Sequence, residues 1–329
     1  MTELLQIVFD ALSLGSLYAL GALGIALIFG VMRLVNFAHG DFIASCVFAM
    51  LWPSTSAAAI VFAGNLPFYL LVPLLLIIGA GLSVLSEVIV FRRFRNANPA
   101  TMMIASFALG FAIRNFLLML YSSRPKSITL WPTLGLPVEV LGARIPMLQV
   151  VTIVVTLTVL AALTLFLKRT RYGLEMRAAA ENFTMARMLG VRANAVILFA
   201  FAISGMLAAA IGLILATNSG TADINMGANV MLIAFIATVI GGLGSVPGAV
   251  AAGFLIGAAS VVFQATLPHD AASSATPSSM ARSSWFCWCA RKGCSHRNPP
   301  SRGSEPCRSG LQSYGGPSRR RSSSPCCCS

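Results

Sequence analysis

Residues 146–167 read PMLQVVTIVVTLTVLAALTLFL and contain no Asp, Glu, Lys or Arg. An α-helix of about 20 apolar residues spans the hydrocarbon core of a bilayer, which is about 30 Å thick. A helix at the surface of a soluble protein needs a polar face, and this stretch has none. The stretch therefore predicts a transmembrane helix.

Similar apolar stretches follow one another along most of the chain. The candidate spans are 8–31, 36–52, 67–91, 101–121, 146–167, 195–216, 229–243 and 248–267. Several carry glycines at close spacing, such as Gly253 and Gly257, and such glycines let helix backbones approach each other in lipid. We therefore expect an all-α fold, a polytopic transmembrane helix bundle with about eight spans over residues 1–268.

The composition excludes several other classes of protein. Hydrophobic residues make up 57% of the 329 residues and charged residues only 10%, with a mean hydropathy of +0.82. A soluble domain carries about a quarter charged residues, so this chain cannot cover its surface with polar side chains. An ordinary soluble enzyme, a disordered protein and a secreted disulfide scaffold are thereby excluded. Cys46 is the single cysteine before residue 270, so the predicted membrane part has no disulfide framework.

The basic residues predict which connections face the cytoplasm. If the crossings alternate, one set of connections holds ten Lys and Arg residues and the other set holds three. The first set is Arg33, Arg92, Arg93, Arg95, Lys168, Arg169, Arg171, Arg177, Arg187 and Arg192, and the second is Arg124, Lys126 and Arg144. Cytoplasmic loops carry an excess of Lys and Arg, so residues 168–193 are expected in the cytoplasm and the N-terminus outside. Arg114 falls inside a predicted span, where it either pairs with an acid or snorkels to the interface.

The longest polar segment of the predicted membrane part is KRTRYGLEMRAAAENFTMARMLGVRA at residues 168–193. Asn182 can cap a short helix there, and Gly190 can end it in the left-handed conformation. Met185, Met188 and Leu189 then lie on one helical face at the spacing i, i+3, i+4. Such a helix either lies on lipid headgroups or docks into a groove on a partner protein.

Three polar residues stand at the cytoplasmic start of candidate span 36–52: Asn36, His39 and Asp41. Asn36 and His39 are one helical turn apart, so they are expected to share a face. One interpretation is that the three residues line a translocation pathway, where their donors and acceptors replace the water around a zwitterion. The other is structural: Asn36 caps the helix, while His39 and Asp41 stabilise a bend.

No motif for nucleotide, metal or catalytic chemistry occurs before residue 269. The glycine-rich residues 241–248 lack the Lys of a phosphate-binding loop and are expected to form a tight turn between packed helices. The basic residues are not spread over a soluble face, as a nucleic-acid-binding protein requires. We expect no catalysis, cofactor, metal or nucleic acid. Single acids near span ends, Asp10, Glu87 and Asp223, are expected to be interfacial.

The remaining residues, 269–329, have a different composition. Residues 271–329 contain sixteen Ser, six Pro and seven Cys, and no apolar periodicity there can bury a core. Two interpretations fit: a disordered basic tail, or a frameshifted reading frame. A one-base shift that restores an apolar span in the coding DNA would select the second.

Four segments resemble the branched-chain amino acid permease family of bacterial ABC importers. Residues 177–182 (RAAAEN) and 186–191 (ARMLGV) resemble its coupling loop, and residues 24–41 (GIALIFGVMRLVNFAHGD) its N-terminal signature. Residues 241–249 (GGLGSVPGA) are similar to its late glycine-rich turn. The general coupling-loop pattern of ABC importers is Glu-Ala-Ala, three residues and Gly. Ala186 and Gly190 match it, whereas Thr184 and Met185 depart from it. The resemblance covers about residues 1–268 and is nearest to the H-type permease subunit of the high-affinity system.

The resemblance implies a permease subunit of an ATP-driven importer for branched-chain or related amino acids in the bacterial inner membrane. It implies four kinds of partner: a second permease subunit, two ATP-binding cassette ATPase subunits that hydrolyse ATP, a periplasmic amino-acid-binding protein and the lipid bilayer. It also implies that the ATPase grips the short helix of the loop through Glu181, Asn182, Thr184, Met185, Ala186, Met188, Leu189 and Gly190. Family members continue with another apolar span after residue 268. The alternatives are an ion-coupled secondary amino-acid carrier, against which the scarcity of midplane acids counts, and a membrane anchor without transport.

Overall fold

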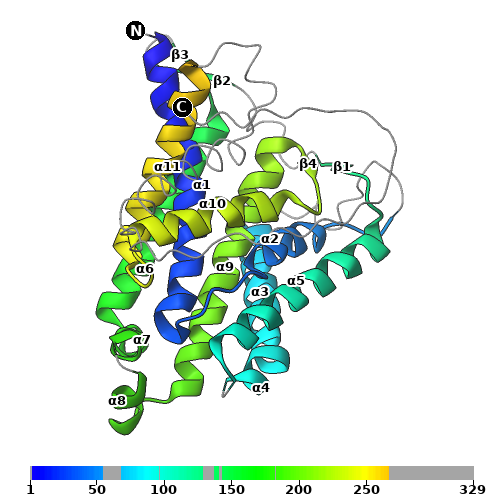
Figure 1. The fold of residues 1–329 in the computed structure, drawn as a ribbon. Coiled ribbons are helices and arrows are strands. Elements are labelled where there is room, and N and C mark those ends of the chain that lie inside the picture. The colour runs from blue at the N-terminus through cyan, green and yellow to red at the C-terminus, as the bar shows by residue number, and fades with distance from the viewer. Residues whose placement is uncertain are drawn as a thin grey trace, which may run out of the picture. The chain divides into compact units, whose positions relative to one another are not determined.

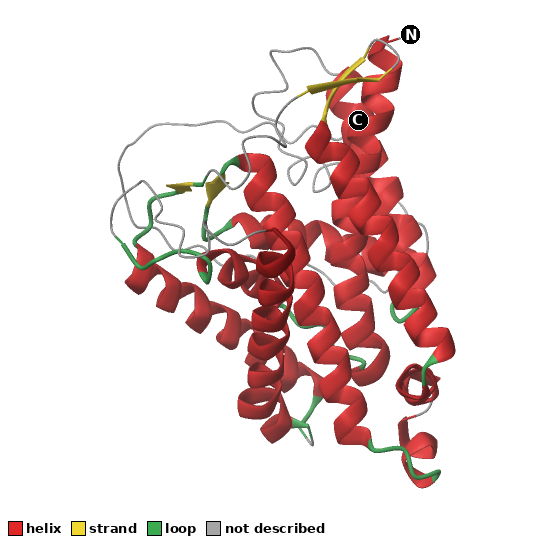
Figure 2. Ribbon diagram, turned by 180° about the vertical axis from the view of Figure 1, so that it is seen from behind, coloured by secondary structure: helices red, strands yellow, loops and turns green. Residues whose placement is uncertain are grey.

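The computed structural model describes residues 2–54, 68–95, 97–128, 137–140, 143–181 and 183–266. Most of this part of the chain is helical, and Figures 1 and 2 show long helices bundled side by side. The predicted all-α helix bundle is confirmed. The prediction of a disordered or frameshifted tail at 269–329 lies outside the described residues.

The helices of the described part fall into two classes by length. Six of them are long and apolar enough to cross a bilayer. They are α1 (Thr2–Met32), α3 (Phe68–Ser86), α5 (Pro99–Tyr121), α6 (Met147–Arg169), α9 (Ala193–Ser219) and α11 (Val246–Thr266). Helix α3 is continued by the π-helical turn η1 (Glu87–Phe91) and by α4 (Arg92–Phe94). The shorter helices are α2 (His39–Phe48), α7 (Arg171–Glu181), α8 (Phe183–Met188) and α10 (Met226–Gly241). Two short antiparallel strand pairs lie in the connections between helices. β1 (Lys126–Ser127) pairs with β4 (Thr221–Ala222), and β2 (Pro137–Val140) pairs with β3 (Ala143–Pro146).

The predicted count of about eight spans is not confirmed. The predicted spans 36–52 and 229–243 correspond to α2 and α10, which have 10 and 16 residues. An α-helix rises about 1.5 Å per residue, so α2 covers only about half of the hydrocarbon core. Apolar composition does not distinguish a spanning helix from a short helix enclosed by protein, and every residue of α2 is buried.

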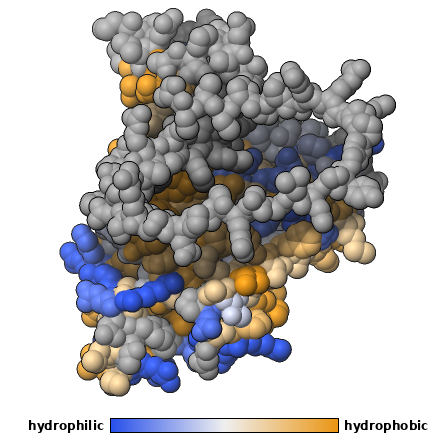
Figure 3. Space-filling view, viewed as in Figure 1, coloured by the Kyte–Doolittle hydropathy of each residue, from blue (hydrophilic) through white to orange (hydrophobic). Residues whose placement is uncertain are grey.

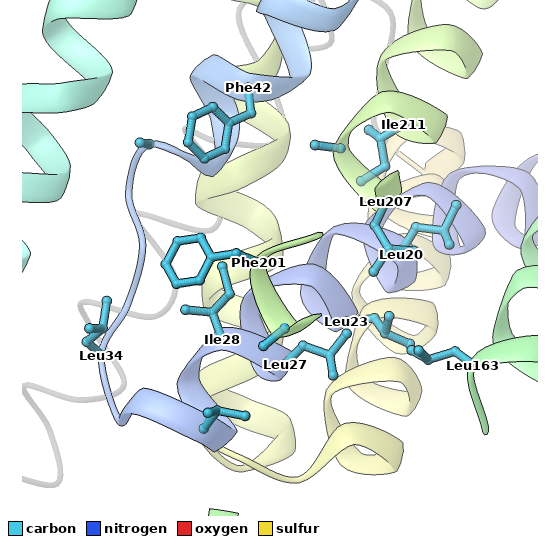
Figure 4. Packing of buried hydrophobic residues seen from close by; sticks show 14 of the residues in the cluster. Leu20, Leu23, Leu27, Ile28, Leu34, Phe42, Leu163, Phe201, Leu207 and Ile211 are labelled. Atoms are coloured by element: carbon cyan, nitrogen blue, oxygen red, sulfur yellow. The ribbon is translucent and has the colours of Figure 1, made fainter. Parts of the chain in front are cut away.

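Helix α1 lies at the centre of the bundle. Residues 15–28 are all buried, because other helices surround this apolar segment, which has no polar stripe to present to water. Figure 4 shows its leucines in the main core, beside apolar side chains of α9 and α6. The labelled members from these helices are Leu20, Leu23, Leu27, Ile28, Phe201, Leu207, Ile211 and Leu163.

Helices α1–α2–α3 and α9–α10–α11 pack as two equivalent units. Each has the order long, short, long, and α1 packs against α11 as α9 packs against α3. At the closest approaches a glycine of one helix faces a glycine of the other: Gly15 and Gly257, Gly79 and Gly205, Gly40 and Gly227. The units run in opposite directions, since Gly21 of α1 approaches Ile211 of α9 while Gly24 approaches Ser204. This is the arrangement of inverted repeats in membrane transport proteins.

The two ends of the bundle carry different elements. Helices α7 and α8 lie at one end, and the β2–β3 hairpin lies at the other, beside the start of α1 (Figures 1 and 2). At the α7–α8 end Arg33 donates to the Glu181 carbonyl, and Arg95 donates to Asn194. In Figure 3 hydrophilic side chains gather over the lower part of the surface, where Figure 1 shows α7. The three predicted cytoplasmic connections thus meet at one end.

Candidate functional site

His39 joins α2 to two long helices through buried hydrogen bonds. The Oγ of Ser204 in α9 lies 3.2 Å from Nδ1 of His39 and donates to the Gly24 carbonyl of α1 at 3.1 Å. Because the single hydroxyl proton is used on Gly24, we assign the His39 proton to Nδ1, which donates to Ser204. The acceptor Nε2 is buried with no partner among the described residues. His39 therefore holds α1, α2 and α9 together.

Asn36 lies in the loop before α2 and not on the helix. Its Oδ1 accepts from the backbone N–H of Ala38 at 3.1 Å, which makes a local turn into the helix. Its Nδ2 is buried and has no partner within the described part of the chain. The predicted shared helical face of Asn36 and His39 is wrong, because α2 begins only at His39. Both residues nevertheless lie buried at the start of the helix.

Asp41 and Arg114 form an ion pair between α2 and α5. The Nε and Nη2 of Arg114 donate to Oδ1 of Asp41 at 3.0 and 2.9 Å. The side chain of Asp41 is 9% exposed and that of Arg114 is 33% exposed. Gly110, one turn before Arg114, leaves space for the carboxylate, because a Cβ there would overlap Oδ2 of Asp41. Of the two predicted roles of Arg114, the structure shows pairing with an acid.

Helix α5 and the segment after it also satisfy the carboxyl end of α2. The hydroxyl of Tyr121 lies 2.9 Å from the carbonyl oxygen of Phe48 and 3.0 Å from that of Leu51. The ammonium group of Lys126 donates to the carbonyl of Ser54, six residues after the end of α2. Carbonyl groups at a helix end have no partner within the helix, so a helix that stops inside the bundle needs such donors. The short helix α2 is thus anchored to α5 near both of its ends.

Helix α8 ends in a Schellman motif. The N–H of Val191 donates to Ala186 at 3.1 Å, and the N–H of Gly190 donates to Arg187 at 3.2 Å. Gly190 has a φ of +88° and no heavy atom within 4 Å of the position of a Cβ. Glycine is therefore favoured here by the left-handed backbone conformation, whereas a side chain would meet no steric crowding. The predicted end of the helix at Gly190 is confirmed.

Three large apolar side chains project around the end of α8, and we call Met185, Met188 and Leu189 the α8 knob. All three are exposed, Met188 at 76% and Leu189 at 86%. Ala186, on the other side of the helix, is buried in the main core. The predicted apolar face therefore exists and points away from the bundle.

The remaining predicted coupling residues lie around the junction of α7 and α8. Glu181 is the last residue of α7, is exposed, and its carbonyl oxygen accepts from Arg33 at 3.3 Å. Asn182 and the side chain of Thr184 lie outside the described residues, so the capping role of Asn182 stays a prediction. The contact with Arg33 links the loop directly to the end of α1.

Several partners in these sites had no clear signal in the sequence. Glu87 was expected to be interfacial, but it is buried at the start of η1 and pairs with Arg95 of the next connection. The role of Gly110 in leaving space for the partner of Arg114 could have been inferred, because it lies four residues before Arg114. Nothing in the local sequence connects Ser204 with His39. Among the described residues, no group of three His, Cys, Asp or Glu side chains comes together.

Comparison with known proteins shows the family. Residues 7–279 match the family described as branched-chain amino acid transport system / permease component. The chain belongs to this permease family. The permease is 32% identical over 275 residues to the high-affinity branched-chain amino acid transport system permease protein BraD of Pseudomonas aeruginosa, covering 78% of this chain and 84% of BraD. The resemblance inferred from the sequence is confirmed.

Two further relatives differ in how much they share. The permease is 31% identical over 278 residues to the protein of the same description, LivH, of Escherichia coli, covering 81% of this chain and 88% of LivH. The autoinducer 2 import system permease protein LsrC of Yersinia enterocolitica is 28% identical over 130 residues, 37% of this chain and 36% of LsrC. No solved structure matches the permease. Together with the apolar helices, the family makes the chain a multi-pass membrane protein.

Proposed function

We propose that the permease is the membrane-spanning subunit of an ATP-driven importer for branched-chain or related amino acids in the bacterial inner membrane. The observation that carries this proposal is the α8 knob, an apolar surface at the end of the bundle where the basic connections meet. Its partners are a second permease subunit, two ATP-binding cassette ATPase subunits and a periplasmic amino-acid-binding protein. ATP is hydrolysed by the ATPase subunits.

In this mechanism the α8 knob inserts into a groove on an ATPase subunit. Methionine side chains are flexible and polarizable, which suits them to a contact that is remade in every cycle. Closure of the ATPase dimer displaces α8 and α7, and the contact between Arg33 and Glu181 transmits the displacement to α1. We place the translocation pathway at Asn36, His39 and Asp41, of which His39 packs against Gly24 of α1.

The alternative, an ion-coupled carrier, requires an acid inside the membrane that is free to take up a proton or sodium ion. The buried acids of the described part are Asp41 and Glu87. Both are paired with arginines, Arg114 and Arg95. Asp10 is in neither ion pair, but it lies near the start of α1 and away from the midplane. These positions favour the ATP-driven importer over the ion-coupled carrier.

Met188→Asp is expected to weaken ATPase binding about thirtyfold, because it puts a charge at an apolar anchor worth about 2 kcal/mol. ATP-dependent leucine uptake should fall in parallel. Gly190→Val should also weaken ATPase binding and lower uptake, because the left-handed conformation costs a non-glycine residue about 1–2 kcal/mol. Co-purification with the ATPase subunits and uptake into membrane vesicles measure both effects.

Two conservative variants serve as matched controls. Met188→Leu keeps an apolar anchor, and Gly190→Asn keeps a residue that tolerates the left-handed conformation. Both should bind the ATPase and transport almost as the unchanged chain does. If Met188→Asp and Gly190→Val behaved like these controls, α8 would only rest on lipid headgroups and the coupling proposal would lose its support.

The proposed orientation predicts a labelling pattern. In a chain whose other cysteines are replaced by Ser, Met188→Cys should resist a membrane-impermeant thiol reagent in intact cells and react in inverted vesicles. Arg124→Cys should show the opposite pattern, because its connection faces outward. Labelling of Met188→Cys in intact cells would reverse the topology.

A further inference from the structure

A cavity of about 460 Å³ opens between the ends of α1, α6, α9 and α11. These helix ends lie at the side of the bundle that carries the β2–β3 hairpin, opposite α7 and α8 (Figure 1). Five polar side chains line it together with aliphatic ones, and those used below are Asp10, Gln149, Asn218, Gln264, Leu14 and Leu215. The volume and the mixed lining are typical of small-molecule sites.

The wall formed by α1 and α6 offers hydrogen-bond acceptors. The Nε2 of Gln149 donates to Oδ1 of Asp10 at 2.7 Å, and Oε1 of Gln149 is buried with no partner among the described residues. Neither ion pair recorded in the described part of the chain involves Asp10. A carboxylate beside an unpaired amide oxygen suits an ammonium group, which brings a positive charge and three donors.

The opposite wall supplies complementary groups. Asn218 of α9 and Gln264 of α11 each carry an amide NH₂ that can donate to a carboxylate. Leu14 and Leu215 lie in the same lining and offer a surface to a hydrocarbon chain. Acceptors on one wall, donors on the other and aliphatic surface between them match a molecule with an ammonium group, a carboxylate and a branched alkyl chain.

We infer that this cavity binds a free aliphatic α-amino acid at the end of the bundle where substrate enters. The inference rests on the proposed function and adds a substrate site separate from the α8 knob and from Asn36, His39 and Asp41. Asp10 and Gln149 take the ammonium group, and Asn218 and Gln264 take the carboxylate. The alkyl chain packs on Leu14 and Leu215.

Photolabelling of the full importer complex in lipid nanodiscs tests the site. A diazirine analogue of leucine should attach to residues that line the cavity, and excess leucine should suppress the attachment. 4-Methylpentanoate, which is leucine without its amino group, should compete at least about tenfold less well, because a hydrogen-bonded charge is lost. Asp10→Asn should lower the labelling yield about tenfold for the same reason. Asp223→Asn, an acid outside the cavity lining, should leave the yield unchanged.

Labelling only outside the cavity, or equal competition by 4-methylpentanoate and leucine, would overturn the inference. The comparison of the two competitors needs no variant, so it decides even if Asp10→Asn misfolds. ATP-dependent leucine uptake by the same complex in proteoliposomes tests the proposed function separately. Uptake without labelling in the cavity would refute the site alone, whereas labelling in the cavity without ATP-dependent uptake would refute the importer assignment and support the site.

Discussion

Replacing Arg114 with Leu is expected to destabilise the permease by roughly 3 kcal/mol, because Asp41 is left buried without its partner. This value is at the lower end for a broken buried ion pair, since a third of the Arg114 side chain remains exposed. Thermal and denaturant unfolding of the purified chain in detergent would measure the loss. Leucine uptake should fall as well, because the pair holds the short helix α2 against α5.

The matched control removes both charges. In the double variant Arg114→Leu, Asp41→Leu no uncompensated carboxylate remains, so most of the lost stability should return. The two single variants complete a double-mutant cycle that isolates the interaction of the pair. Additive effects of the single variants would show that the contact contributes nothing to folding, and α2 would then be held mainly by Tyr121 and by apolar packing.

Gly79→Leu is expected to separate α3 from α9 and to cost about 3 kcal/mol or more. A Cβ at Gly79 would overlap the carbonyl oxygen of Gly205 and lie 2.8 Å from the Cβ of Ala209. Overpacking costs about 1–3 kcal/mol where side chains can move aside, but here the obstacle includes backbone. The amount of folded chain in the membrane and its unfolding midpoint would report the change.

Gly81 provides a control in the same helix, two residues away. No heavy atom lies within 4 Å of the position of a Cβ at Gly81, so Gly81→Leu should change stability by less than about 0.5 kcal/mol. An equal loss in both variants would mean that α3 requires glycine for a reason other than close approach to α9.

The sequence predicted what depends on neighbouring residues. The apolar stretch 146–167 became α6, Met147–Arg169, because length and composition decide whether a helix can cross a bilayer. Gly190 was identified because a left-handed helix end favours one residue type. The interaction of Arg114 with an acid was one of two expectations, because an intramembrane charge has few other ways to be satisfied.

The remaining features depend on residues that are far apart in the chain. An apolar segment reads the same whether lipid or protein surrounds it, so the ending of α2 at Phe48 was not visible. His39 and Ser204 are 165 positions apart, and no local pattern marks their contact. The cavity beside Asp10 draws on four helices, and the sequence showed only single polar residues near span ends.

The opposed directions of the two three-helix units bear on how the permease changes shape. Two units whose helices pack in the same order can exchange conformations, so that each unit adopts the conformation that the other unit had before. The exchange would turn an opening at the hairpin end into an opening at the α8 end. Both working states would then have the same fold with the roles of the two units exchanged. For the importer proposed above, the free-energy difference between the states would be small enough for differential binding of a partner to reverse.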